Sequence, residues 1–220
     1  ENNAFSLPAS KGQWPINSLG GVVAGVGHLN QLQDVDGAVR QEPLLVNYYG
    51  KAVPSMALLA ALKSLNLNAS DIQLVAGESV QIGKLRIKTD ASALMLPQFY
   101  PARDGKPAFA VDSFYDVLSG KIPASKYAGK VVVIGATAAG VGTQFPVPGN
   151  PSLSPAETIA HITSSILGGH FIVQPGWTAW AGPLVFAMVC LYLIFAMPWL
   201  SASMAAVSTT LLFLTLLGAE

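Results

Sequence analysis

The sequence has a single cysteine and, in its last third, almost no charge. Cys190 alone supports neither a disulfide framework nor a cysteine-based metal site. Lysine and arginine together number 12, as do aspartate and glutamate, so the formal net charge is zero. No basic surface is therefore expected to attract nucleic acid. These absences exclude a disulfide-rich scaffold and argue against a nucleic-acid-binding protein.

The charges that are present lie in the first part of the chain. All lysines and arginines lie at or before Lys130, and the acidic residues after it are Glu157 and Glu220. No Asp, Glu, Lys or Arg occurs from Thr158 to Ala219. The chain is therefore expected to join a mixed-charge soluble domain to a nearly uncharged tail.

Two stretches of the uncharged tail predict transmembrane helices. Residues 177–200 are long enough to cross a bilayer and carry tryptophans near both ends, where aromatic residues prefer the membrane interface. Residues 201–219 form a second, truncated candidate after the break at Pro198. A buried helix pair of a soluble protein is the alternative, and the length of sequence without charge argues against it. A membrane is thus a predicted partner.

The strongest local signal in the soluble part is GKVVVIGATAAGVG, residues 129–142. Four β-branched residues, Val131 to Ile134, show no polar alternation, which predicts a central strand buried on both faces of an α/β sheet. Gly135 ends the run and begins a loop of small residues that lets another backbone or a ligand come close. Phosphate binding is an alternative, but the loop lacks the Lys-Ser/Thr ending of a P-loop and the Gly-x-Gly-x-x-Gly order.

The rest of the soluble part alternates between strand and helix signals. Residues 1–19 are expected to form a loop left from a truncated N-terminal part, a strand is predicted from Gly20, and Asp36-Gly37 predicts a hairpin turn. Further predicted elements are a helix over residues 54–63 with Pro54 in its first turn, two antiparallel strands within 72–88, a helix over 112–120 capped by Asp112, and a last strand within 170–173. The predicted fold class is α/β, a mixed sheet with flanking helices over residues 20–175, followed by transmembrane α-helices.

The sequence Ser154-Pro155-Ala156-Glu157 predicts the start of another helix. Serine at the N-cap, proline at N1 and glutamate at N3 make a capping box. Three isoleucines then share one helix face, and two glycines end the helix. Glu157 is the only charge in a long neutral stretch, but its capping position explains it better than a role as a catalytic acid.

The polar residues show no catalytic or metal-binding set. The acidic turn at Asp36 resembles the start of a calcium loop, but the position that needs a bidentate glutamate holds Leu45. His28, His161 and His170 have no carboxylate or cysteine at ligand spacing, so structural roles are expected, although histidines can titrate near neutral pH. No Ser-His-Asp arrangement can be assembled. We therefore expect no catalytic residue, metal or cofactor in this portion.

Three blocks of the sequence carry a resemblance to a known family. They are residues 27–44, with the pattern Gly-His-Leu-Asn, then Asp-Val-Asp-Gly-Ala-Val-Arg, then Pro-Leu; Pro54-Ser55 at the start of a helix; and residues 129–140 with the helix that follows at Glu157. Together they resemble the type 2 CHASE domain, an extracytoplasmic sensor of bacterial cyclases, histidine kinases, Ser/Thr kinases and related receptors. The signature residues, mostly structural, are then Asp36, Gly37, Arg40, Pro43, Gly135, Thr137, Gly140 and Glu157, and ligand-binding residues stay unknown.

This resemblance implies a sensory input module of a bacterial transmembrane receptor. The α/β domain would lie outside the bacterial inner membrane and pass a ligand- or partner-induced change to a cytoplasmic cyclase, kinase or phosphodiesterase elsewhere in the protein. Self-association, a membrane-protein partner or an unidentified small molecule would supply the stimulus. The alternative is a non-catalytic docking or assembly subunit of a membrane protein complex. Because the chain begins with Glu1 and ends after an apolar run, we expect it to be a piece of a longer protein.

Overall fold

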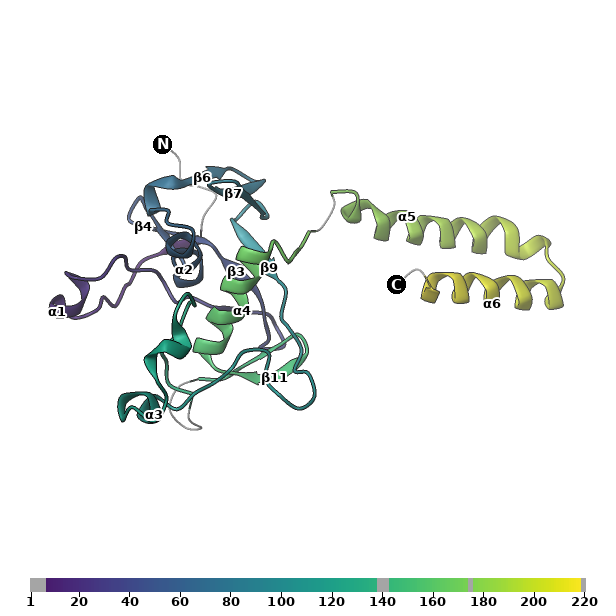
Figure 1. Ribbon diagram of the computed structural model, residues 1–220. Coiled ribbons are helices and arrows are strands. Elements are labelled where there is room, and N and C mark those ends of the chain that lie inside the picture. The colour runs from purple at the N-terminus through teal and green to yellow at the C-terminus, as the bar shows by residue number, and fades with distance from the viewer. Residues whose placement is uncertain (1–6, 138–142, 174–175, 219–220) are drawn as a thin grey trace. The chain divides into compact units, whose positions relative to one another are not determined.

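The computed structural model describes residues 7–137, 143–173 and 176–218. The chain divides into two compact units, Glu1–Val173 and Gln174–Glu220 (Figure 1). Every strand that the structure describes lies in the first unit, together with four of the α-helices. Helices are the regular secondary structure of the second unit over its described residues.

The strands of the first unit form four small sheets. One has the order β1-β4-β5 and contains β1 (Leu7–Ala9), β4 (Leu45–Tyr48) and β5 (Lys51–Pro54). The second has the order β12-β9-β3-β2 and contains β2 (Leu32–Gln33), β3 (Val39–Pro43), β9 (Leu94–Pro97) and β12 (Phe171–Ile172). The third is the meander β6 (Ile72–Val75), β7 (Ser79–Ile82) and β8 (Leu85–Lys88), and the fourth pairs β10 (Phe145–Val147) with β11 (Asn150–Leu153). Because β1 runs parallel to β4 and the other ladders are antiparallel, the predicted mixed α/β class is confirmed.

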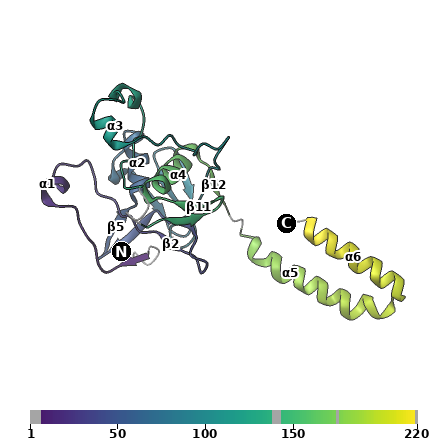
Figure 2. The same cartoon turned by 90° about the horizontal axis from the view of Figure 1, so that it is seen from below.

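Two helices carry most of the core. The helices of this unit are α1 (Asn17–Gly20), α2 (Met56–Ser64), α3 (Phe114–Leu118) and α4 (Pro155–Gly168). Helices α2 and α4 lie side by side, as both Figure 1 and Figure 2 show. Leu58 and Leu62, one turn apart on α2, are fully buried against Ile162 and Ile166 of α4 and against the sheets. A second, smaller cluster gathers around Val39 and Phe99.

The predicted capping box of α4 is confirmed. The Ser154 hydroxyl oxygen accepts a hydrogen bond from Glu157 N (3.3 Å), and Ser154 N donates to Glu157 Oε2 (3.1 Å). At the other end, Gly169 adopts the left-handed conformation with φ of 64°, as expected for a glycine that ends a helix. The predicted hairpin at Asp36-Gly37 is confirmed too, with φ of 79° at Gly37 between β2 and β3. A strand within residues 170–173 is present as β12.

The predicted central strand at Val131–Ile134 is wrong. These residues have no regular secondary structure, and Val131, Val132 and Ile134 are 48%, 51% and 74% exposed. A β-branched run becomes a strand where another strand offers free backbone groups to pair with, and none of the described strands pairs with this run. The expected close approach at Gly135 is confirmed, because a Cβ there would lie 2.7 Å from Cβ of Ala156.

The strand predicted from Gly20 is also absent. After α1 the chain forms turns and coil, and it pairs at a single bridge between His28 and Ser55. Interspersed glycines deprive this stretch of the side chains that a strand packs against its neighbours. The preceding segment, expected to be a loop, contains β1 and most of α1 within its described residues.

Three smaller corrections concern element ends. Pro54 ends β5 and does not begin α2, whose N-cap is Ser55. Asp112 does not cap α3, since its carboxylate instead accepts hydrogen bonds from Lys126 Nζ (2.7 Å) and Tyr127 Oη (2.8 Å). Residues 72–88 form three strands and not two, because Gly77 and Gly83 both take positive φ and each permits a tight turn.

The second unit contains two apolar helices that run antiparallel (Figures 1 and 2). Helix α5 (Thr178–Leu191) continues through a π-helical turn and a 3₁₀ turn to Trp199, and α6 covers Ala202–Gly218. The Tyr192 hydroxyl lies 2.6 Å from Ser208 Oγ of α6. Among the described residues, Thr178–Trp199 is long and apolar enough to cross a membrane, whereas α6 is shorter.

Candidate functional site

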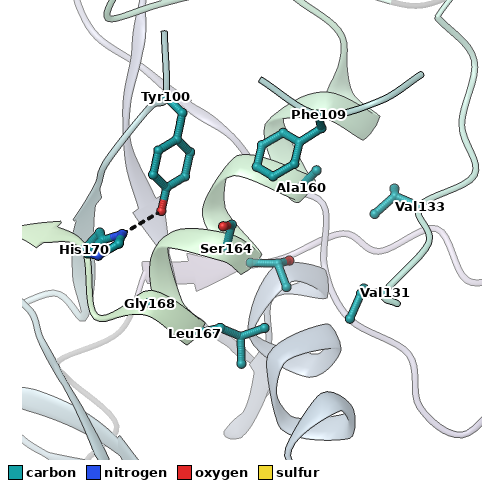
Figure 3. Close-up of a pocket in the computed structure, with 10 residues that line it drawn as sticks. Tyr100, Phe109, Val131, Val133, Ala160, Ser164, Leu167, Gly168 and His170 are labelled. Carbon is teal, nitrogen blue, oxygen red and sulfur yellow. Dashed lines mark hydrogen bonds between the residues drawn. The ribbon is translucent and has the colours of Figure 1, made fainter. Parts of the chain in front are cut away.

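An open, mostly apolar pocket of about 480 Å³ lies beside α4 (Figure 3). This volume falls in the range of small-molecule sites, about 300–1,000 Å³. The residues that line it are Tyr100, Phe109, Val131, Val133, Ala160, Thr163, Ser164, Leu167, Gly168 and His170. They come from α4, from the chain after β9, from the exposed valine run and from the residue before β12.

One face of α4 forms the floor of the pocket. Ala160, Thr163, Ser164 and Leu167 have the spacing i, i+3, i+4 and i+7, which places them on one side of a helix. In Figure 3, Val131 and Val133 lie on the opposite side of the pocket from Tyr100 and His170. The valine run that failed to form a strand therefore supplies one wall.

An aromatic cluster supports the wall at Tyr100 and Phe109. The ring of His161 stacks on Tyr100, with centroids 5.8 Å apart, and meets the ring of Phe109 edge-on at 4.9 Å. His161 Nδ1 accepts a hydrogen bond from Tyr100 N (3.1 Å), so its neutral form carries the hydrogen on Nε2. Burial lowers the pKa of His161, against a smaller opposing effect of Glu157. His161 thus acts as a neutral positioning residue behind the pocket.

Tyr100 and His170 form the main polar pair of the pocket. The Tyr100 hydroxyl lies 3.1 Å from His170 Nδ1, as the dashed line in Figure 3 marks. The turn that ends α4 holds His170 in place, since His170 N donates to Ser165 O (2.9 Å). At Gly168, a Cβ would lie 2.9 Å from His170 Nδ1, so glycine leaves room for the ring. The pair can offer a ligand a hydrogen-bond donor or an acceptor.

The lining of the pocket contains no carboxylate, ammonium or guanidinium group. None of its lining residues is Asp, Glu, Lys or Arg. Over the residues that the structure describes, no group of three or more His, Cys, Asp and Glu side chains could hold a metal ion. The arrangement suits a neutral, partly apolar molecule with one hydrogen-bonding group.

The signature residues of the β2–β3 hairpin do not line this pocket, and two of them, Asp36 and Arg40, form a solvent-exposed ion pair. Arg40 binds Asp34 and Asp36, each at 2.6 Å, and Asp36 also accepts a hydrogen bond from Ala38 N. The guanidinium of Arg40 is the largest cause of a pKa of Asp36 well below its usual range. Because these ion pairs are open to solvent, we assign them to hairpin geometry more than to stability. Pro43 is buried at the end of β3.

Two of the remaining signature residues, Gly135 and Glu157, lie at the start of α4. Gly135 packs against Ala156, next to the capping residue Glu157. Thr137 follows in a segment without regular structure, and Gly140 lies outside the described residues. These contacts set the path of the valine run past α4, although no signature residue lines the pocket itself.

Sequence reasoning missed the pocket residues because they come from segments far apart in the chain. Tyr100 and the His161 that fixes it are 61 positions apart. One local signal was available, namely the small and hydroxyl side chains repeated along one face of the predicted α4.

The fold and site define an α/β domain with a neutral pocket, followed by an apolar helix long enough to span a membrane. The chain belongs to the CHASE2 domain family, which matches it over residues 3–198, and the resemblance expected from the sequence is confirmed. CHASE2 domains are extracytoplasmic sensory domains of signalling receptors and are not themselves catalytic. The chain has no match among curated proteins or solved structures.

Proposed function

We propose that this chain is the input module of a bacterial inner-membrane receptor, and that its pocket binds a small neutral molecule whose presence is passed to a cytoplasmic output domain. The observation that carries the proposal is the position of the pocket on α4. In sequence, α4 is followed directly by β12 and then by the apolar helix α5. The element that binds the ligand, α4, and the helix that would transmit the signal, α5, are therefore separated in the sequence only by β12 and a short link.

The signal requires two states of the domain with different affinity for the ligand. A ligand in the pocket contacts α4 on one side and Val131 and Val133 on the other, so it favours one separation of these two segments. The link at residues 174–176, Gln-Pro-Gly, is short and leaves little chain to absorb a displacement of β12 before α5 begins.

The pocket is tested by filling it. N-phenyl-1-naphthylamine, a neutral aromatic dye, should bind the chain in nanodiscs and raise the fluorescence above that of the dye in empty nanodiscs of the same lipid. Ala160→Phe puts a ring into the pocket and should weaken dye binding at least tenfold. Ala91→Phe, at an exposed position, is the matched control and should bind as the wild type does. Equal dye binding by both variants contradicts the assignment of the pocket.

Transmission is tested with a fluorophore on Cys190, the single cysteine of the chain. Dye binding should change the emission of this label in the wild type. A Gly-Ser linker inserted after Gly176 should abolish that change and leave dye affinity intact. If the emission change survives the linker, the signal does not pass through this connection.

One observation favours the second candidate function, that of a docking subunit for a neighbouring membrane protein. Val132 and Ile134 are exposed and do not line the pocket, so they present an apolar edge. A docking subunit should show no stability gain with small molecules and should co-purify with a protein. Val132→Asp should then remove the partner and leave dye binding unchanged.

A further inference from the structure

A second, smaller cavity lies at the junction of four segments of the first unit. Its volume is about 20 Å³, enough for about one water molecule. Residues 28–31, Glu42 of β3, the first turn of α2, and Pro155, Ile159 and Ile162 of α4 line it. The lining side chains of His28, Gln31 and Glu42 have groups that can bind water or a proton, as has the amide of Asn30.

Two of these side chains present unpaired atoms of opposite character. His28 Nε2 and Gln31 Oε1 are both buried without a hydrogen-bond partner among the described residues. Asn30 N donates to His28 Nδ1 (3.3 Å), so the neutral imidazole carries its hydrogen on Nε2. The backbone of Pro43 acts on this ring as a weak hydrogen-bond partner, but Nε2 makes no hydrogen bond of normal geometry to a described residue and still needs an acceptor. Gln31 Oε1 needs a donor. One water molecule can satisfy both, because it accepts and donates.

The third side chain, Glu42, is a buried carboxyl group with no cationic partner among the residues that the structure describes. Glu42 is 5% exposed, and its hydrogen-bond partner is the Ser55 hydroxyl, whose oxygen also accepts from Leu58 N at the start of α2. Arg40, on the same strand, is held by Asp34 and Asp36. Burial raises the pKa of Glu42 to about 8, and the bond from Ser55 opposes this rise.

The other described elements around this cavity place no further charged residue in its lining. The α2 residues that line the cavity are Met56 and Ala57, and β9 places Met95 opposite Glu42. On α4, Glu157 is engaged in the capping box and His161 faces Tyr100. His28 is therefore the one titratable side chain that shares the cavity lining with Glu42. Burial lowers the pKa of His28 to about 4, which keeps it neutral at pH 7.

We propose that this cavity is a proton-binding site, in which Glu42 carries a dissociable proton beside one water molecule held by His28 and Gln31. At alkaline pH the carboxylic acid releases its proton to solvent and leaves a carboxylate in an apolar junction. The carboxylate draws in water and loosens α4 from the start of α2 and from residues 28–31. The domain thereby responds to external alkalinity, a stimulus separate from the ligand pocket and independent of whether that pocket is filled.

The two titrating groups affect stability with opposite signs. Glu42 binds its proton more tightly in the folded state, so stability falls as pH rises from about 4.5 towards 8. His28 binds its proton less tightly in the folded state, so stability rises with pH from about 4 to 6.5 and is constant above that. Glu42 therefore dominates this pair between about pH 6.5 and 8, where the unfolding equilibrium constant should rise by up to about tenfold per pH unit.

The change of the unfolding equilibrium constant with pH is measured by hydrogen exchange of the α2 amides. The full chain is used in nanodiscs, and the exchange rates are corrected for their intrinsic pH dependence. In the wild type the unfolding constant should rise between pH 6.5 and 8, whereas in Glu42→Gln, which is neutral at every pH, it should not. Glu78→Gln, at an exposed ion pair with Arg86, is the matched control and should keep the rise. A flat wild-type profile, or a slope that persists in Glu42→Gln, overturns the proposal.

Infrared spectroscopy of the wild type tests the site without relying on a variant that has to fold. A carbonyl stretching band of a protonated carboxylic acid should be present at pH 7 and lost by pH 9. Its absence at pH 7 overturns the proposal. A band that is lost at pH 7 when Zn²⁺ is added in stoichiometric amount also overturns it, because Glu42, His28 and Gln31 would then form a metal site. Dye binding to the ligand pocket should be the same in Glu42→Gln as in the wild type, which keeps the two proposals separate.

Discussion

At the scale of single residues, a backbone contact at Gly27 holds the loop of residues 28–31 in place. A Cβ at Gly27 would lie 2.7 Å from Met56 N and 2.8 Å from Met56 Cα, and backbone atoms cannot rotate away as a side chain would. The backbone of His28 is also held, because His28 N donates a hydrogen bond to Pro54 O and His28 O accepts one from Met56 N. We expect Gly27→Ala to destabilise the domain by about 1–3 kcal/mol, as overpacking does, in urea unfolding of the chain.

Gly25→Ala is the control for this prediction. Its Cβ would meet Leu59 Cδ1 at 3.5 Å, an ordinary van der Waals contact. A change of less than about 0.5 kcal/mol is expected, as at sites without a special backbone or packing constraint. If the two variants lost equal stability, the close contact at Met56 would not be what anchors the loop.

At the scale of elements, the end of α4 determines the position of His170 in the pocket. Gly169 has φ of 64°, which costs a residue with a Cβ roughly 1–2 kcal/mol. We expect Gly169→Ala to lower stability by about 1 kcal/mol and to weaken dye binding, because His170 N bonds to Ser165 O across this turn. Thermal unfolding and dye titration measure the two effects.

Gly169→Asn is the matched comparison for the helix end. Asparagine takes the left-handed conformation more readily than alanine, so it should lose less stability. Equal losses for alanine and asparagine would show that backbone conformation is not the cause.

At the scale of the whole molecule, the helical unit is expected to anchor the chain in a bilayer. Met188 lies near the middle of the span Thr178–Trp199. A lysine at the centre of a membrane helix costs about 2.5–3.5 kcal/mol on insertion scales. Met188→Lys should therefore reduce the fraction of chain that resists carbonate extraction from membranes. Trp199→Lys, at the end of the span, can reach the interface and should insert normally. If both variants remained equally inserted, this helix would not cross the bilayer as proposed.

The sequence-based predictions were correct where the interacting residues are close together in the sequence, and wrong where they are far apart. The α4 capping box and the Asp36-Gly37 hairpin were predicted correctly because their hydrogen bonds join residues a few positions apart. The strand at Val131–Ile134 was wrong because pairing depends on a distant segment that the run itself does not encode. The pocket was missed for the same reason, since its polar pair joins Tyr100 to His170.

The sequence by itself determined the CHASE2 family, the mixed α/β class, the ends of α4 and the uncharged tail, because composition, caps and turns act over short distances along the chain. Tertiary structure alone decided which side chains meet. It placed His170 against Tyr100 in the pocket beside α4, and it put the buried Glu42 and His28 into the lining of one small cavity. Burial depends on contacts between segments remote in sequence, and burial is what raises the pKa of Glu42.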